Sequence, residues 1–217
     1  IVNLGFWPGG DRDGNPFVTT EITIKTASKL KSDIIKNYYR DIRKLRRRLT
    51  FKNVEDIIID LERRLYSSIN EFSEGPKISL IDLKKKLYKV RDILISEHKS
   101  LFLDHLEDVI NKVNIFGYHF ASLDIRQDSR IHTKAFEKVF KIAQQKNLTS
   151  SKIDYNSLND EDKSKSLSDL KGDISPNSFE DDLVVSTLSS IRAMKSIQKL
   201  NGEKGSNRYI ISNNQSS

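Results

Sequence analysis

Apolar residues recur along much of the chain at steps close to the repeat of an amphipathic helix, with polar residues on the opposite face. These positions are Ile34, Ile35, Tyr38, Ile42, Leu45 and Leu49; Val54, Ile57, Ile58, Leu61 and Leu65; Leu80, Leu83, Leu87, Val90 and Leu94; and Leu183, Leu188, Ile191, Met194 and Ile197. The first three sets predict long antiparallel helices that pack together. The fourth set predicts a helix over residues 178–200.

Three short segments have the pattern of strands instead. Residues 3–7 run into a glycine-rich loop, residues 119–126 combine aromatic and β-branched side chains, and residues 208–212 carry the run Arg-Tyr-Ile-Ile-Ser. Strands that lie so far apart in sequence, with helices between them, favour parallel pairing in an α/β sheet or barrel. We therefore expect an α/β fold that is strongly helix-rich and whose remaining strands are absent from the chain.

Composition limits the class of protein. The 217 residues are 36% hydrophobic and 31% charged, which suits one globular core or a large part of a bigger one, and not a disordered tail. The formal charge of 37 − 30 = +7 attracts anions. Nucleic acid, an acidic membrane surface and small phosphorylated or carboxylated metabolites all fit a basic chain, as does solubility alone.

The chain contains no cysteine, which excludes disulfides and thiolate metal sites and is compatible with a reducing, cytoplasmic location. No apolar run approaches the roughly 20 residues that a membrane helix needs, so we expect no membrane association. The chain begins at Ile1 rather than at a methionine and shows no signal-peptide pattern, which suggests an internal fragment.

The most unusual local feature is the loop Gly9-Gly10-Asp11-Arg12-Asp13-Gly14-Asn15. Its glycines allow close backbone approach to a ligand, and Arg12 offers a planar fork that fits a phosphate or a carboxylate. Loops that follow strands carry most sites in α/β folds, so Arg12 is the first candidate anion ligand. Asp11 and Asp13 would hold its guanidinium or accept hydrogen bonds from neighbouring backbone amides. The alternative is a rigid turn with a local ion pair.

The loop does not match the other motifs that bind cations or phosphates. Its acidic and amide residues alternate as in a calcium loop, but glycine stands at the fourth place rather than the sixth and no glutamate stands at the twelfth. A GxGxxG fingerprint and a phosphate loop ending in Gly-Lys-Ser/Thr are absent. The four histidines include no HExxH pair, and His98 and His105 are expected to line one helix face as structural residues. We predict no metal and no nucleotide site.

Two further groups of charges are candidates. Arg126 follows a strand-like segment beside Asp124 and Gln127, and could place a second cation at the same strand-end face as Arg12. A structural salt bridge is the alternative for Arg126. The basic run at residues 40–48 could suggest nucleic acid, yet its interleaved apolar positions are typical of an amphipathic helix with a solvated face, so we expect no nucleic-acid partner.

The loop, read together with Leu123-Asp124-Ile125-Arg126-Gln127, resembles the phosphoenolpyruvate carboxylase family. His132-Thr133 and the run at 209–212 agree with the family in order and spacing, so the resemblance covers nearly the whole chain. The seven-residue loop is specific, the second motif is less so, and the last strand is weak by itself. On this resemblance, residues 1–217 are an internal segment of a single carboxylase domain, with barrel strands near 3–7, 119–126 and 208–212.

The resemblance implies a fold and an activity. The family has partial TIM-type barrels with long inserted helices, here incomplete, and its members are carbon–carbon lyases that form cytoplasmic homotetramers. They carboxylate phosphoenolpyruvate with bicarbonate to oxaloacetate and phosphate, which supplies the tricarboxylic acid cycle, and they require Mg²⁺ or Mn²⁺. By its place in the motif Arg12 would bind the substrate phosphate, and the surrounding residues would support it: Gly9, Gly10, Asp11, Asp13, Gly14 and Asn15 in the loop, with Arg126 and Asp124 nearby.

Other family motifs are absent from the chain. The catalytic histidine belongs to an upstream Thr-Ala-His-Pro-Thr motif, and the metal carboxylates and a Gly-Arg-Gly-Gly loop lie downstream. The resemblance therefore implies that the chain holds neither the catalytic residue nor the metal ligands, and that it is inactive alone. The competing class is a non-enzymatic helical binding or scaffold module, in which the glycine loop is only a turn. Strong, salt-dependent binding to unrelated nucleic acids would favour that class.

Overall fold

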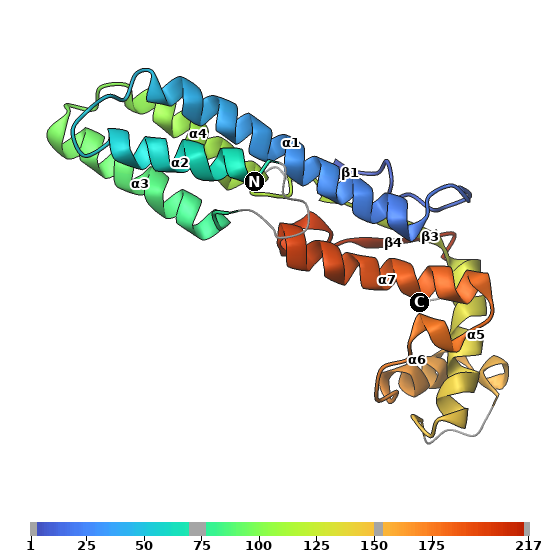
Figure 1. Ribbon diagram of the computed structural model, residues 1–217. Helices are drawn as coiled ribbons and strands as arrows, with labels where there is room; N and C mark the ends of the chain where they lie inside the picture. The colour runs from blue at the N-terminus through green and yellow to red at the C-terminus, as the bar shows by residue number, and fades with distance from the viewer. Residues whose placement is uncertain (1–3, 70–76, 150–153, 215–217) are drawn as a thin grey trace. The chain divides into compact units, whose positions relative to one another are not determined.

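The computed structural model of the chain describes residues 4–69, 77–149 and 154–214, which form seven α-helices and four short strands (Figure 1). The helices are α1 (Thr20–Arg46), α2 (Glu55–Ser67), α3 (Leu80–Glu97), α4 (Leu103–Phe116), α5 (Ser129–Gln145), α6 (Asp160–Ser168) and α7 (Asp182–Asn201). The strands are β1 (Gly5–Phe6), β2 (Ser122–Leu123), β3 (Ile125–Asp128) and β4 (Tyr209–Ser212). The predicted helix-rich character is confirmed. Asn3, the first residue of the strand predicted over residues 3–7, lies outside the described residues.

The chain divides into two compact units. The first contains Lys25–Ser122 and Ile197–Gly205, and the second contains Phe6–Ile24, Leu123–Ser196 and Ser206–Ser217. No helix among the described residues is long and apolar enough to cross a membrane.

The first unit is a helical bundle with one continuous hydrophobic core. The apolar positions predicted for the first three helices all lie in this core, where only Ile57 and Leu80 are partly rather than fully buried. Helix α4 adds Leu106, Val109, Ile110 and Val113 to the core. The prediction that these helices pack together is confirmed, because each side chain that returns at the helical repeat meets another helix rather than water.

Tyr38 and Asp60 are among the polar residues of the bundle whose pKa values are strongly shifted. The hydroxyl of Tyr38 donates to the backbone oxygen of Gly117 at 2.7 Å, and burial raises the pKa of Tyr38 well above its usual range. For Asp60 on α2, burial opposes ionisation, but hydrogen bonds from Arg63, Arg64 and Lys86 outweigh burial and lower its pKa to about 2. A deprotonated Asp60 therefore stabilises the folded bundle.

The two histidines expected on one helix face do not share a helix. Helix α3 ends at Glu97 and α4 begins at Leu103, so that His98 follows one helix and His105 lies in the next. Each ring stacks on a phenylalanine, His98 on Phe51 and His105 on Phe102. Both histidines are therefore structural, although the prediction of a common face was wrong.

The second unit is built on a parallel strand pair. Strand β3 pairs with β4 in parallel, with Ile125 opposite Tyr209 and Asp128 opposite Ser212. This confirms parallel pairing between the second and third predicted strands. The intervening chain forms α5, α6 and the part of α7 that belongs to this unit, as a parallel connection requires.

The strand predicted over residues 119–126 is shorter and later than expected. Gly117 and Phe120 have φ angles of 49° and 66°, which turn the chain at the end of α4, and extended structure begins only at Ser122. The strand is then interrupted at Asp124, which divides it into β2 and β3. Strand β2 pairs with β1. At the interruption, the Asp124 amide donates to the Phe6 oxygen of β1 at 3.0 Å.

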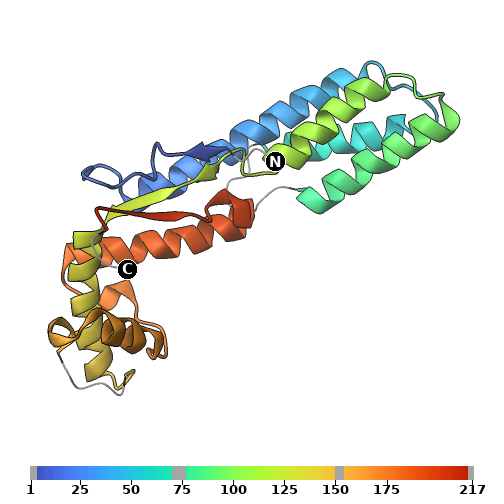
Figure 2. The ribbon, with the colours of Figure 1, turned by 180° about the vertical axis from the view of Figure 1, so that it is seen from behind.

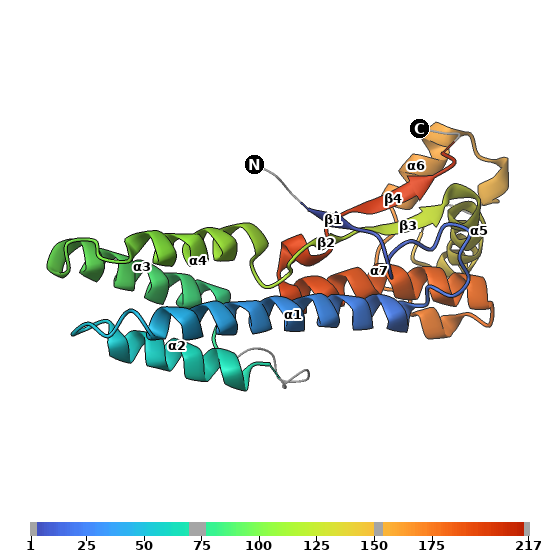
Figure 3. The ribbon, with the colours of Figure 1, turned by 90° about the horizontal axis from the view of Figure 1, so that it is seen from above.

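Helix α7 buries a different face from the predicted one. Of its predicted apolar stripe only Ile197 is fully buried, and Ile191 is 42% exposed. The buried positions are Val184, Thr187, Ser190, Ala193, Ile197 and Asn201. The hydroxyls of Thr187 and Ser190 donate to backbone oxygens of the preceding turn at 2.8 and 2.7 Å. Because these polar groups are satisfied within the helix, a face of small residues can be buried, and it lies alongside β3 and β4 (Figure 2 and Figure 3).

Candidate functional site

The loop that follows β1 turns sharply and then runs beside β3. The amides of Gly10 and Asp11 both donate to the Trp7 oxygen, at 2.8 and 3.0 Å. Gly10 is buried, and a Cβ added to it would lie 2.2 Å from the backbone oxygen of Asp124. The close backbone approach at Gly10 is thus to the protein itself, between β2 and β3, and the approach to a ligand that was expected of the glycines stays a prediction. Beyond the turn, Asp11 forms a parallel bridge with Arg126.

This bridge places the two candidate arginines on opposite faces of the strands. Asp11 and Arg126 are paired residues and their side chains meet, with a carboxylate oxygen 3.0 Å from a guanidinium nitrogen. Arg12 is the next residue, and successive side chains in extended structure point to opposite sides. The expectation that Arg126 would bring a second cation to the same face as Arg12 was therefore wrong.

We call the two sides the charged face and the helix face. The charged face carries Trp7, Asp11, Asp13, Asp124, Arg126, Asp128 and Arg208. The helix face carries Arg12, Gln127 and Tyr209 and is covered by α7.

On the helix face, Arg12 is held by a single residue of α7. One guanidinium nitrogen donates to the Ser186 backbone oxygen at 2.9 Å, and another makes a short hydrogen bond to the Ser186 hydroxyl. Within residues 4–69, 77–149 and 154–214, Arg12 has no ion pair with a carboxylate, so Asp11 and Asp13 do not hold its guanidinium. The alternative role is confirmed for Asp11, whose carboxylate accepts the Asp13 amide at 3.3 Å. Burial lowers the pKa of Arg12, although Tyr209 opposes that shift.

A cavity of about 480 Å³ lies beside Arg12. Gly14 and Asn15 of the loop, Gln127 of β3, and Ser186 and Thr187 of α7 are among the residues that line it. The Asn15 side chain accepts a hydrogen bond from the Phe17 amide at 3.0 Å. The lining also includes one carboxylate, Asp182, which has no ion pair with Arg12. The Arg12 guanidinium is therefore the group in this cavity that suits an anionic ligand.

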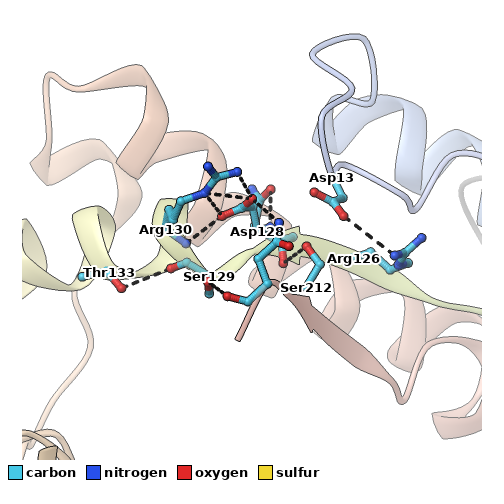
Figure 4. A network of polar contacts seen from close by, with 9 residues as sticks. Asp13, Arg126, Asp128, Ser129, Arg130, Thr133 and Ser212 are labelled. Carbon is cyan, nitrogen blue, oxygen red and sulfur yellow. Dashed lines mark hydrogen bonds and ion pairs between the residues drawn. The ribbon is translucent and has the colours of Figure 1, made fainter. Parts of the chain in front are cut away.

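On the charged face, Arg126 is surrounded on three sides. Asp11 lies 3.0 Å from its guanidinium. Asp13 lies 3.8 Å from it on another side (Figure 4). The guanidinium also lies over the Trp7 ring, 4.4 Å from its centroid. Its Nε is buried and has no hydrogen-bond partner in the part of the chain that the structure describes. Arg126 therefore forms the structural ion pair that was its alternative role. Its partners, Asp11 and Asp13, are the carboxylates that were expected beside Arg12.

Asp124 links two parts of the charged face. Its side chain is nearly fully buried, and it accepts from the Trp7 indole N–H at 3.1 Å and from the Arg208 Nε at 2.7 Å. Arg208 was predicted as the first residue of a strand but not as a residue of the site. The register of β3 and β4 is the signal that could have identified it. Ile125 is opposite Tyr209, so Arg208 is level with Asp124.

Comparison with known families explains the loop. The family model for phosphoenolpyruvate carboxylase matches residues 1–79 and 73–217. The chain belongs to the phosphoenolpyruvate carboxylase family. Curated carboxylases share 29% identity over 64% of this chain in Aeromonas hydrophila, 31% over 61% in Shewanella sediminis and 25% over 64% in Thermosynechococcus vestitus. The aligned regions are 19%, 18% and 19% of those proteins, so the chain spans about a fifth of the length of its carboxylase relatives.

The second motif ends in a corner that hydrogen bonds hold together. Asp128 caps α5 by accepting the Arg130 amide at 2.8 Å, and its other oxygen accepts from Asn213 at 3.0 Å (Figure 4). Hydrogen bonds from the Arg130 side chain and from Asn213 hold the pKa of Asp128 far below its usual range. The Ser129 hydroxyl donates to the Asn213 oxygen, which ties the ends of β3 and β4 together.

The histidine of the third motif has a structural environment. His132 Nε2 lies 3.0 Å from the Tyr209 hydroxyl, and the two rings meet edge to face. Burial, with a smaller contribution from Arg12, lowers the pKa of His132. The ring is therefore neutral near pH 7, and it supports the strand pair from the helix face.

The phosphoenolpyruvate carboxylase family implies a divalent metal cofactor, and the carboxylates here do not fit one. A metal site needs several oxygen ligands that are free to converge on one point. On the charged face Asp11 and Asp13 pair with Arg126, while Asp124 and Asp128 bind other guanidinium groups. Among the described residues no cluster of three or more metal-binding side chains occurs. We therefore derive no step through a metal.

Proposed function

We propose that the full-length protein is a phosphoenolpyruvate carboxylase, a carbon–carbon lyase that converts phosphoenolpyruvate and bicarbonate to oxaloacetate and inorganic phosphate. The observation that supports this proposal is the family match over residues 1–79 and 73–217. A glycine-rich loop that presents Arg12 beside a cavity agrees with it. The new carbon–carbon bond forms at the methylene carbon of the substrate, and the phosphate leaves the enol oxygen.

The proposed role of Arg12 is to bind the substrate phosphate. A guanidinium with neutral partners retains its full attraction for an anion, and in a partly buried site that attraction is screened less than in water. Charge that develops as carboxyphosphate and enolate form would be stabilised by the same group. The rest of the loop, Gly9, Gly10, Asp11, Asp13, Gly14 and Asn15, fixes the backbone that carries Arg12.

Arg126 is the second candidate for the anion ligand. In a TIM-type barrel the helices lie outside and the site lies at the strand ends, so the face opposite α7 would point toward the interior. That argument favours Arg126. Its charge, however, is already balanced by Asp11 and Asp13, so an anion would have to displace one of these carboxylates.

The decisive experiment uses the full-length protein with saturating bicarbonate and Mg²⁺, and compares the wild type with Arg12→Ala and Arg126→Ala. Loss of a charged hydrogen bond to the substrate costs about 1.5–3 kcal/mol. Replacing the arginine that binds the phosphate should therefore raise KM for phosphoenolpyruvate roughly 10- to 150-fold. Arg192→Ala is the matched control, because Arg192 pairs with exposed Asp173 on the surface of the same unit.

The outcomes separate the hypotheses. A large rise in KM for Arg12→Ala alone supports its proposed role, and a rise for Arg126→Ala alone transfers the role to the charged face. A wild type that does not consume phosphoenolpyruvate rejects the enzyme. Salt-dependent binding of the same protein to unrelated nucleic acids would then favour the helical scaffold.

The remaining family properties belong to the same proposal. We propose that residues 1–217 are a segment of one carboxylase domain with an incomplete TIM-type barrel, and that Mg²⁺ or Mn²⁺ binds residues outside this segment. We also propose a cytoplasmic homotetramer. Light scattering of the full-length protein after size-exclusion chromatography tests the tetramer, and a monomeric mass would reject it.

A further inference from the structure

Arg208 lies outside the motifs that carry the family resemblance, yet it contacts the centre of the charged face. Strand register places Arg208 level with Asp124, and its backbone oxygen accepts the Ile125 amide at 3.2 Å. Its Nε donates to one Asp124 oxygen at 2.7 Å. One terminal nitrogen of Arg208 is buried without a hydrogen-bond partner among the described residues. Arg208 is thus directed at the buried carboxylate, and its charge is not spread over several carboxylates.

Asp124 transmits this contact to Trp7. Its second oxygen accepts the indole N–H at 3.1 Å. Trp7 is 51% exposed, and a ring so open to solvent would ordinarily sample several rotamers. Here the N–H edge is held by Asp124, and one ring face is covered by the Arg126 guanidinium. Arg126 in turn pairs with Asp11 and Asp13 of the loop.

We propose that Arg208 is a positioning residue: it fixes Asp124, which fixes the Trp7 indole, and the stacked Trp7 and Arg126 hold the Gly9–Asn15 loop. Without Arg208, Asp124 would be a buried carboxylate with no cationic partner, which is costly. The carboxylate would turn toward water, and the indole would lose its fixed acceptor. The role in catalysis rests on the proposed function, because it assumes that the loop binds substrate.

The first test follows Trp7 directly, without any activity. Trp7 is the only tryptophan of the chain, so fluorescence that is excited at a wavelength the seven tyrosines do not absorb reports the environment of Trp7 alone. Arg208→Ala should shift the emission maximum to longer wavelength and make acrylamide quenching more efficient. Arg208→Lys keeps a cation and should give a smaller change, whereas Arg192→Ala should give none. Circular dichroism checks that each variant keeps the wild-type helix content.

The second test is a double-mutant cycle in the full-length protein, with KM for phosphoenolpyruvate as the measured quantity. Trp7→Phe keeps a ring under Arg126 but removes the N–H that Asp124 accepts. Arg208→Ala and Trp7→Phe should each raise KM about tenfold with little change in kcat. The coupling between the two substitutions should then also be about tenfold, which is within the range for residues of one network. The double variant should be no worse than either single variant.

Two results would overturn the proposal. The first is an Arg208→Ala chain whose emission and quenching equal those of Arg192→Ala. The second is a double variant in which the two effects on KM multiply, since Arg208 would then act by a route that avoids Trp7. A wild type that lacks carboxylase activity would reject the proposed function and leave the fluorescence test of the positioning chain fully decisive.

Discussion

Replacing Gly10 by alanine should strongly destabilise the second unit. The added Cβ would lie 2.2 Å from the Asp124 oxygen, whereas real Cβ contacts are essentially never shorter than 3.0 Å, so the backbones must separate by at least 3.0 − 2.2 = 0.8 Å. That movement strains the bond from the Arg126 amide to the Gly10 oxygen and the bond from the Asp124 amide to Phe6. Overpacking costs about 1–3 kcal/mol and each of the two weakened hydrogen bonds about 1 kcal/mol, so we expect a total of about 3–5 kcal/mol.

Gly14→Ala is the matched control in the same loop. A Cβ at Gly14 would have no atom within 4 Å, so only its φ angle of 68° disfavours alanine, at about 1 kcal/mol. The assay is urea unfolding followed by the fluorescence of Trp7, which lies in the second unit. If Gly10→Ala is no less stable than Gly14→Ala, the close contact between the loop and β3 does not exist and the geometry of the site must be revised.

Three further predictions concern the helical bundle. Tyr38→Phe should lower the free energy of unfolding by about 1–3 kcal/mol, because the buried Gly117 oxygen loses its donor. Urea unfolding followed by circular dichroism measures this change. An unchanged free energy of unfolding would mean that water replaces the hydroxyl. Ser79→Ala should cost about 1 kcal/mol in the same assay, because the Ser79 hydroxyl caps α3 by accepting the Asp82 amide; a neutral substitution would refute the cap. Asp60 has a folded pKa of about 2, below the ordinary value of 3.8, so its stabilisation is complete above about pH 4 and is lost as pH falls through about 2. The stability difference between wild type and Asp60→Asn should shrink over that range, and a constant difference would contradict the shifted pKa.

The bundle was predictable because its signal is periodic and local. Residues such as Ile42, Leu61 and Leu87 return at the helical repeat, and nothing competes with burial on that face. Helix α7 was predicted as a helix but with the wrong face, since hydrophobicity alone does not identify Thr187 and Ser190 as buried. Their hydroxyls are satisfied by the helix backbone, a compensation that becomes visible only when the packing of the face is known.

The candidate site was predictable in its residues but not in its pairing. The loop and Arg126 stand out by composition, yet the partners of each charge depend on which residues face each other across two strands. The Asp11–Arg126 bridge determines which charges pair. If the loop were shifted by one residue along β3, each of its side chains would lie on the opposite face. Sequence alone therefore assigned the carboxylates to Arg12, and it gave no indication of Ser186 or Arg208, which come from distant parts of the chain.

The arrangement on opposite faces leads to a last prediction, about the double variant Arg12→Ala with Arg126→Ala. Arg12 contacts Ser186, whereas Arg126 contacts Asp11, Asp13 and Trp7, so the two side chains share no partner. Substitutions without shared partners usually act independently, and the effects on KM for phosphoenolpyruvate in the full-length protein should therefore multiply. If each single variant raises KM and the double variant is no worse than one of them, the two guanidiniums are coupled and act on one ligand. The alternation of Asp11 and Arg12 could not then hold, and the loop would have to rearrange when substrate binds.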